Sequence, residues 1–282
     1  MKFLDIKTDF AFKKVFGSED SKERLISFLN AVLKFENGAK IKDLTIVDPY
    51  NIPQLLGMKD TYVDVKAVLD NDSKVIIEMQ VLNHRGFEKR VLCNAAKNYS
   101  TQLLEGEQYH LLNPIIALTI VDFIMFEDCE KVISNFKLLE KEQFINYSDD
   151  LEMVFIELPK FNKQLHELSD ITDQWIYFIK NAGSLKYIPN NLPRAIVSAF
   201  EVSNTAILSA EELELQYKKK EFISIQKLAL MLAEEKGKAE GKAEGKIETQ
   251  IEIAKDMLSK HIDESLIVEI TKLSPEQIKT LG

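Results

Sequence analysis

Residues 61–80 decide the fold, and they read TYVDVKAVLDNDSKVIIEMQ. Odd-numbered positions are apolar from Val63 to Leu69 and from Val75 to Val81, on either side of the polar turn Asp70–Ser73, and side chains alternate across a strand. The pattern therefore predicts a hairpin with one buried face. If the two strands pair about Asn71, Asp64 lies directly opposite Glu78, with Cβ atoms about 5 Å apart.

Two carboxylates at this distance repel each other unless a cation lies between them. Gln80 shares the face of Glu78, so two carboxylates and one amide oxygen would reach one hard cation such as Mg²⁺. The alternative is a solvated sheet face whose charges simply meet water. Against it, Val68, Ile76 and Leu82 lie on the same face, so the polar residues stand among apolar ones. The sequence predicts a metal site at the two acids.

Other segments predict the layers around this hairpin. Asp9 begins a predicted helix with Phe12 and Phe16 on one face. A wholly apolar strand covered on both faces is expected at Ile115–Val121. Further elements are expected at 41–47 (strand), 86–105 (helix), 153–158 (strand) and around Trp175 (helix). Their order predicts an α/β fold (α+β mixed sheet) with helices on both faces, followed by a mostly helical C-terminal region.

The composition changes from residue 209 onward to Glu, Lys, Ala and Leu, which is typical of a long exposed helix. We expect one large domain over 1–208 with a helical second half, a charged helical linker over 209–246 and a small helical bundle over 247–282. The linker contains a Gly-Lys-Ala-Glu repeat. Each glycine costs about 1 kcal/mol of helix stability relative to alanine, which predicts a frayed helix or a hinge.

The overall composition limits the possible binding partners and the cellular compartment of the protein. A net charge of −9 gives no basic signature, so any DNA contact must come from local patches. The two cysteines, Cys93 and Cys129, form no C-x-x-C pair and indicate a reducing compartment. The first residues lack a signal peptide, and no run approaches the roughly 18 apolar residues of a membrane span. We expect a cytoplasmic protein with no membrane contact.

Few other residues are candidates for a functional site. Asp9 would add a third acid from the first helix, or would serve only as a helix cap. Arg90 and Lys97, seven residues apart, share one side of a helix and would face either a phosphate backbone or water. The four histidines are scattered and offer no zinc pattern, and no G-x-S-x-G elbow supports a serine nucleophile.

An ordered set of motifs resembles one known family. The set comprises Lys7-Thr-Asp9-Phe-x-Phe12-Lys13-x-x-Phe16, Phe28-Leu29-Asn30, Asp64-Val65, Ile77-Glu78-Met79-Gln80, Phe87-x-x-Arg90, Tyr99, Gly106-x-x-Tyr109, Phe155-Ile-Glu157-Leu158-Pro159-Lys160-Phe161, Trp175 and the Lys-Gly-Lys-Ala-Glu-Gly tail. It resembles the recombination-promoting nuclease family, a transposase-like branch of the PD-(D/E)xK nucleases. The likeness covers roughly the whole chain and rests on the order of the motifs.

The resemblance implies a restriction-endonuclease-like core whose hairpin presents the metal-binding acids. By that likeness Asp64 is the first motif acid, Glu78 the second, and Asp9 the acid from the first helix. The superfamily normally has a lysine where this chain has Gln80, which cannot act as a cation. A nearby base, Lys66, Arg90 or Lys97, would have to replace it.

The resulting hypothesis is a Mg²⁺-dependent DNA endonuclease that hydrolyses phosphodiester bonds, linked to recombination or mobile elements. Asp64 and Glu78 would hold the ion, and Gln80 would ligate it or position the attacking water. The C-terminal helices would contact DNA, form a homo-oligomer, or both. Two alternatives stay open: a catalytically silent nucleic-acid-binding or oligomerising module that keeps the fold, and an interaction protein built around the charged tail.

Overall fold

The computed structural model describes residues 1–35, 38–51 and 61–281. The chain forms two compact units, Met1–Ile223 and Ser224–Gly282, whose boundary falls inside one long helix. The first unit holds all the strands and the predicted acids. Each unit is considered by itself below.

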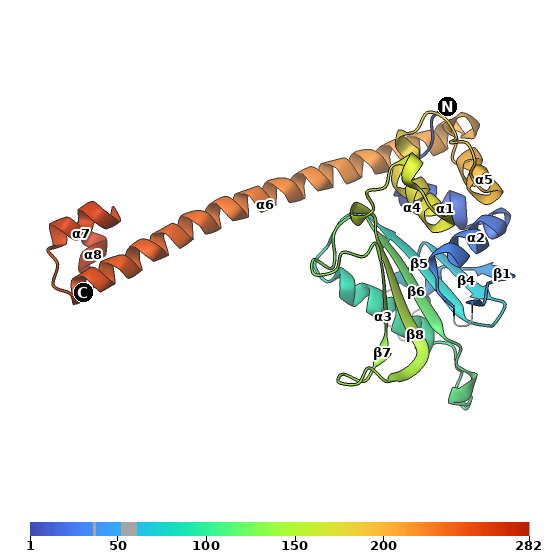
Figure 1. Cartoon of the computed structure of the whole chain (residues 1–282), viewed down its shortest axis with the longest axis horizontal. Coiled ribbons are helices and arrows are strands. Elements are labelled where there is room, and N and C mark those ends of the chain that lie inside the picture. Colours follow the sequence, from blue (N-terminus) through green and yellow to red (C-terminus); the bar gives the residue numbers. More distant parts are fainter. Residues whose placement is uncertain (36–37, 52–60, 282) are drawn as a thin grey trace. The chain divides into compact units, whose positions relative to one another are not determined.

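A six-stranded mixed sheet forms the centre of the first unit (Figure 1). Its order is β1 (Leu44–Val47), β4 (Val65–Leu69), β5 (Lys74–Gln80), β6 (Ile115–Val121), β8 (Asn146–Glu157) and β7 (Ile133–Leu139). The neighbours β5, β6 and β8 run parallel, and the remaining pairs are antiparallel. Every residue of β6 is buried, as expected for a strand covered on both faces. The predicted mixed sheet is confirmed.

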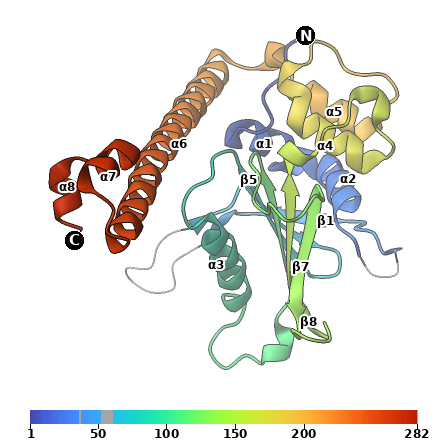
Figure 2. The ribbon, with the colours of Figure 1, turned by 60° about the vertical axis from the view of Figure 1, so that its left-hand side comes forward.

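Helices cover both faces of the sheet, also as predicted (Figure 2). One face packs against α1 (Asp9–Phe16), α2 (Lys22–Val32), α4 (Ile171–Asn181) and α5 (Arg194–Val202). The other face packs against α3 (Phe87–Ser100). Short 3₁₀ turns connect these elements at Glu19–Ser21, Tyr109–Leu111, Leu158–Lys160, Leu165–Glu167, Ala182–Ser184 and Thr205–Ile207.

Aromatic rings fill the larger core between the sheet and its four helices. Phe12 and Phe16, the predicted apolar face of α1, are fully buried. The ring of Phe16 lies 5.0 Å from that of Phe28 and 5.6 Å from that of Trp175, measured between centroids. Aromatic pairs at this separation add attraction beyond the burial of their area. This cluster fixes α1, and with it the start of the chain, against the sheet.

The hairpin has the predicted register but not the predicted length. Val65 pairs with Ile77, which leaves Asp64 and Glu78 as the next two residues on the two strands. The first strand was expected to run unbroken from Thr61. Instead β3 (Thr61–Tyr62) pairs with β2 (Tyr50–Asn51) in a separate two-stranded sheet, and the chain bends at Asp64.

The bend has a physical cause in the Asp64 side chain. Its Oδ2 accepts the backbone N–H of Met79 at 2.8 Å, so a carboxylate replaces the carbonyl that a continuing strand would offer. Beyond this point Val63 donates instead to the carbonyl of Pro49. Val63 therefore joins the core under α3 with Ile76, on the face opposite to the predicted one.

Other boundaries also differ from expectation: β8 begins at Asn146 rather than at residue 153, and β7 lies where no strand was expected. The strand expected from residue 41 begins at Leu44, because the side chain of Asn30 takes up both backbone groups of Ile41. The helix expected over 86–105 ends at Ser100, where the carbonyl of Lys97 accepts both the backbone N–H and the hydroxyl of Thr101. At the start of β1 a side chain has taken the place of main-chain partners, which the spacing of apolar residues does not reveal.

The second unit consists of the later part of α6 (Ala210–Ser259) with α7 (Glu264–Thr271) and α8 (Pro275–Lys279). Its small core is formed by Ala254, Met257, Ile267, Leu273 and Ile278. The Gly-Lys-Ala-Glu repeat, expected to fray or bend, is regular helix throughout. Among the described residues, no helix is both long and apolar enough to cross a bilayer.

A buried ion pair secures the chain after β8. Glu157 is fully buried, its Oε1 accepts the N–H groups of Met125 and Phe126, and its Oε2 lies 2.5 Å from the ammonium of Lys160. That ammonium also donates to the carbonyl of Phe126. The pair therefore holds the segment after β6 against the end of β8.

We expect Glu157→Gln to lower the free energy of unfolding by about 3–5 kcal/mol, because the Lys160 charge is left buried without its counter-ion. Urea unfolding followed by circular dichroism measures this change. The matched control is Glu127→Gln, at an exposed neighbouring position, which should stay within about 0.5 kcal/mol of the wild type. Equal effects of the two substitutions would contradict the stabilising role of the buried pair.

Candidate active site

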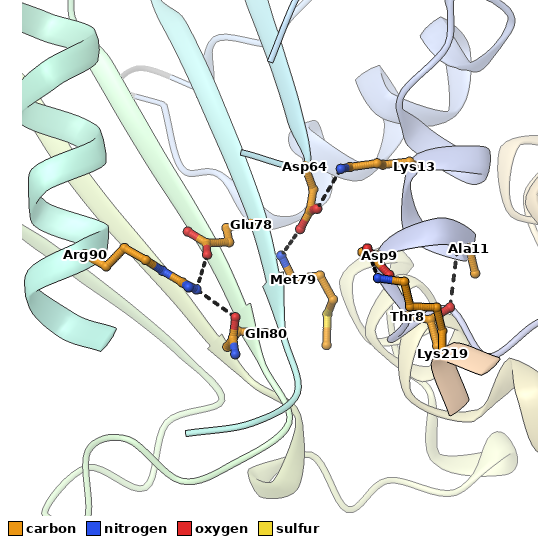
Figure 3. Close-up of polar contacts among 10 residues, drawn as sticks. All are labelled: Thr8, Asp9, Ala11, Lys13, Asp64, Glu78, Met79, Gln80, Arg90 and Lys219. Atoms are coloured by element: carbon orange, nitrogen blue, oxygen red, sulfur yellow. Dashed lines mark hydrogen bonds and ion pairs between the residues drawn. The ribbon is translucent and has the colours of Figure 1, made fainter. Parts of the chain in front are cut away.

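The predicted acids line one cleft of about 270 Å³ in the first unit. The bent hairpin forms one wall, and α1, α3 and the first turns of α6 supply side chains from three other directions (Figure 3). The polar lining residues are Lys7, Asp9, Lys13, Tyr62, Asp64, Glu78, Gln80, His84, Arg90 and Lys219. Acids and bases therefore converge on a single hollow from parts of the chain that are far apart in sequence.

Asp64 is held in place by two different contacts. Its Oδ2 accepts the Met79 N–H, and its Oδ1 lies 3.4 Å from the ammonium of Lys13 on α1. Only 12% of its side chain is exposed, whereas 45% of the Lys13 side chain is. One carboxylate oxygen thus fixes the backbone and the other faces the cations of the cleft.

Glu78 and Gln80 are joined through Arg90. The Nη2 of Arg90, which reaches in from α3, donates to the carboxylate of Glu78 and also to Oε1 of Gln80 at 2.7 Å (Figure 3). The amide nitrogen of Gln80 donates to the carbonyl of Leu82 at 2.7 Å. This second bond fixes the orientation of the amide, so its oxygen points toward Arg90 and the cleft.

Burial raises the pKa of both acids. For Asp64 the loss of water outweighs the Met79 N–H and the Lys13 charge, and the nearby Asp9 raises the pKa further. For Glu78 burial likewise outweighs the Arg90 charge, and Asp64 raises the pKa. Asp9 therefore makes Asp64 harder to ionise, and Asp64 does the same to Glu78. A site that gathers perturbed acids in a cleft is a candidate for chemistry.

Asp9 lies in the cleft, as the sequence predicted, but it is not the helix cap. Thr8 caps α1 by accepting the N–H of Ala11, and Asp9 is the first helical residue. The carboxylate of Asp9 lies 3.0 Å from the ammonium of Lys219, on the first turns of α6. The negative charge of Asp9 is thus offset by the positive charge of Lys219.

Of the three bases considered as substitutes for the missing lysine, Arg90 alone lines the cleft. Lys66 lies on β4 opposite Ile76, half-buried, and burial lowers its pKa. Lys97 is 8% exposed, on a face of α3 turned into the protein. Arg90 and Lys97 were expected to share one exposed side of the helix, and the packing of α3 on the sheet separates them.

Sequence reasoning assigned no role to Lys7, Lys13 or Lys219. Lys13 follows Asp9 by one helical turn, so its place on the same face of α1 was available from the spacing. Lys7 forms an ion pair with Asp122 at 3.3 Å, directly after β6. Lys219 comes from a segment more than two hundred residues away, and no local signal places it here.

The oxygen donors of the cleft fit a hard divalent cation. Two carboxylates and an amide oxygen face one hollow, and these are ligands that Mg²⁺ accepts. Among residues 1–35, 38–51 and 61–281, no group of three or more His, Cys, Asp or Glu side chains is arranged to hold a metal ion. The set suits Mg²⁺ better than Zn²⁺, since Mg²⁺ is commonly bound by one or two carboxylates plus water and substrate phosphate.

A larger hollow of about 1110 Å³ lies elsewhere, between α2, the start of α4 and residues 125–136. Its most buried acid, Asp173, is occupied by Lys163 and by Ser169. These contacts stabilise the start of α4 and leave the acid no spare role. We therefore assign the candidate chemistry to the smaller cleft, where carboxylates of raised pKa converge.

The fold and the cleft together define a nuclease-like protein: a mixed sheet whose bent hairpin presents an Asp and a Glu. The chain belongs to the PD-(D/E)XK nuclease family transposase family, whose model matches residues 6–231. The matched range covers the sheet, its helices and the start of α6. No curated protein and no solved structure gives a significant match to the chain.

The raised pKa values predict how stability depends on pH. Between the ordinary and the raised pKa of each acid, the folded state binds more protons than the unfolded state, so stability falls as pH rises. We expect Asp64→Asn with Glu78→Gln to remove this penalty. The gain in unfolding free energy over wild type should be larger near pH 7.5 than near pH 4.

Urea unfolding at the two pH values measures the difference. Asp72→Asn, in the turn at the other end of the hairpin, is the matched control because it removes an exposed carboxylate. It should show no such pH dependence. A double variant that is less stable than wild type by the same amount at both pH values would contradict the burial of two charges.

Proposed function

We propose that the protein is a Mg²⁺-dependent DNA endonuclease that hydrolyses phosphodiester bonds, with a role in recombination or mobile-element biology. One observation carries the proposal: Asp64 and Glu78, both nearly buried and of raised pKa, face one cleft among basic side chains. Membership of a nuclease family also supports this proposal.

Asp64 and Glu78 would hold the cation, with Gln80 as a further oxygen ligand or as the group that orients the attacking water. When bound, the ion supplies an activated water and offsets the charge that builds on the phosphate. The chain contributes rigidity. The Met79 N–H fixes Asp64, and the Leu82 carbonyl fixes the Gln80 amide, so both oxygens keep their direction before substrate arrives.

Arg90 is our candidate for the cation that the motif lysine supplies elsewhere in the superfamily. It contacts both Glu78 and Gln80, it lines the cleft, and 43% of its side chain is exposed. A guanidinium has five donors, so Arg90 can keep Gln80 and still donate to a phosphate oxygen. It would stabilise charge on the phosphate, without giving or taking a proton.

DNA would approach along the basic residues of the cleft. The chain as a whole carries a charge of −9, so attraction to phosphates must be local. Lys7, Lys13, Lys219 and Arg90 all line the hollow, and Lys13 and Lys219 are each almost half exposed. The ion pairs that Lys13, Arg90 and Lys219 form with the cleft acids would be exchanged in part for contacts to the phosphate backbone.

We expect Asp64→Ala and Glu78→Ala each to lower Mg²⁺-dependent nicking of supercoiled plasmid by at least about 100-fold, because each removes a metal ligand. Asp72→Asn should nick at the wild-type rate. In a second readout, Mg²⁺ should raise the thermal unfolding midpoint of wild type and leave that of the Asp64→Asn, Glu78→Gln double variant unchanged.

Equal nicking by wild type and both alanine variants would overturn this site. A wild type that binds DNA in a gel shift and does not nick with Mg²⁺ or Mn²⁺ would favour the silent nucleic-acid-binding module. The replacement of the motif lysine by Gln80 is the specific observation that keeps this second function in view.

We expect Arg90→Gln to lower the nicking rate by roughly 100-fold while Mg²⁺ still raises the thermal midpoint, since a phosphate-stabilising charge is lost and both acids remain. Lys97→Gln on the same helix is the matched control. It should leave the catalytic rate of the folded protein unchanged, because Lys97 is buried away from the cleft. A folded Lys97→Gln protein that loses as much activity as Arg90→Gln would contradict this assignment.

A further inference from the structure

The part of α6 in the second unit carries an uncovered apolar seam. It consists of Ile225, Leu228, Leu232, Ala239, Ala243 and Ile247, and residues at these spacings follow one side of a helix. Ile225, Leu228, Leu232 and Ile247 are exposed by 58%, 53%, 54% and 47%. Large apolar side chains repeated along one face at this exposure mark an interaction surface.

The same side of α6 is buried where the chain provides a cover. Further along the helix, Ala254 and Met257 pack against Ile267 of α7 and Ile278 of α8 (Figure 1). Among the described residues of this unit, no other segment packs over residues 225–247. The seam therefore continues an established packing surface beyond the reach of the two short helices.

Charges flank the seam asymmetrically. In the triplets Lys238-Ala239-Glu240, Lys242-Ala243-Glu244 and Lys246-Ile247-Glu248, each seam residue follows a lysine and precedes a glutamate. Neighbouring residues point about 100° apart around an α-helix. All three lysines therefore lie on one flank of the seam, and all three glutamates lie on the other.

This asymmetry selects both the partner and its direction. When two identical helices pair side by side in parallel, the left flank of one meets the right flank of the other, as in the g–e′ contacts of coiled coils. Lysines then face glutamates along both edges. In an antiparallel pair each flank meets its own copy, and like charges oppose each other.

We propose that α6 pairs in parallel with the α6 of a second copy of this chain, through the seam at 225–247. The charges of the Gly-Lys-Ala-Glu repeat thus select a second copy of the same helix as the partner. Gly237, Gly241 and Gly245 lie on the opposite, outer side of the helix, where an added Cβ would meet nothing. This proposal is independent of the nuclease assignment, because no cleft residue takes part.

The first experiment measures mass by light scattering of the full-length protein. Wild type should weigh twice the 32.3 kDa of one chain. Changing Lys238, Lys242 and Lys246 to Glu, or Glu240, Glu244 and Glu248 to Lys, gives two flanks of like charge, and each triple variant should weigh 32.3 kDa. An equimolar mixture of the two triple variants should recover the dimer mass, and so should the six-fold variant that exchanges the flanks.

Two controls separate loss of pairing from loss of structure. Circular dichroism should show that both triple variants keep the first unit folded, with an unchanged thermal transition. Gly241→Ala, on the outer side of α6, should raise helicity and leave the dimer mass unchanged. A monomeric wild type, a larger assembly than a dimer, or triple variants that stay dimeric would each overturn the proposal.

The second experiment tests direction by cross-linking, in a background with Cys93→Ser and Cys129→Ser. Ile225→Cys and Ile247→Cys proteins are mixed and treated with a short bismaleimide. Parallel pairing should give links between like positions, 225 to 225 and 247 to 247. Links between 225 and 247 would show an antiparallel pair and overturn the assigned direction. Gly241→Cys, on the outer side, should cross-link at least tenfold more slowly than Ala243→Cys.

Discussion

The hydrogen bond from the Met79 N–H to the Asp64 carboxylate is the constraint on which the candidate site depends. Because of this bond, the pairing of β4 with β5 stops at Val65 and Ile77, and Asp64 and Glu78 do not extend it. The chain then leaves toward β2, and the space beside β5 opens into the cleft. The same carboxylate that shapes the backbone is a proposed metal ligand, so fold and site share one side chain.

The electrostatics of the cleft follow from burial. Two carboxylates that have lost much of their water repel each other, and the chain offsets this with bases brought in from separate helices: Lys13 from α1, Arg90 from α3 and, beside Asp9, Lys219 from α6. The basic side chains of these ion pairs already lie in the cleft, where they could exchange a carboxylate partner for a phosphate. In the proposed nuclease their partly exposed cations would turn to a phosphate, while the buried acids would keep their place.

The two units are built on different principles. In the first, a sheet and its helices bury one large aromatic core, and Gln216 ties the start of α6 to α1 through the buried hydroxyl of Thr8. In the second, three helices share a core of a few residues and leave most of a long helix exposed. A helix of this length with so little intramolecular cover gains most from association with another surface.

The elements that depend on local patterns were predictable. The alternation in 61–80 gave the register of β4 with β5 because a one-residue slip would turn every apolar side chain to water. The unbroken apolar run gave β6 within its observed bounds, since a strand between two layers has no polar face. Phe12 and Phe16 on α1 followed from the same kind of rule, as did the positions of Asp64 and Glu78 just beyond the last paired residues of the hairpin.

Boundaries and partners needed the tertiary structure. The bend at Asp64 and the late start of β1 both arise where a side chain takes the place of a main-chain partner, and composition does not encode which side chain will do so. The same holds for the cations of the cleft. The sequence by itself determined β6, the register of β4 with β5 and the position of the two acids, because these depend on neighbours along the chain. Only the folded chain decided that Arg90 reaches Glu78 and Gln80 while Lys97 turns inward, because that depends on how α3 packs on the sheet.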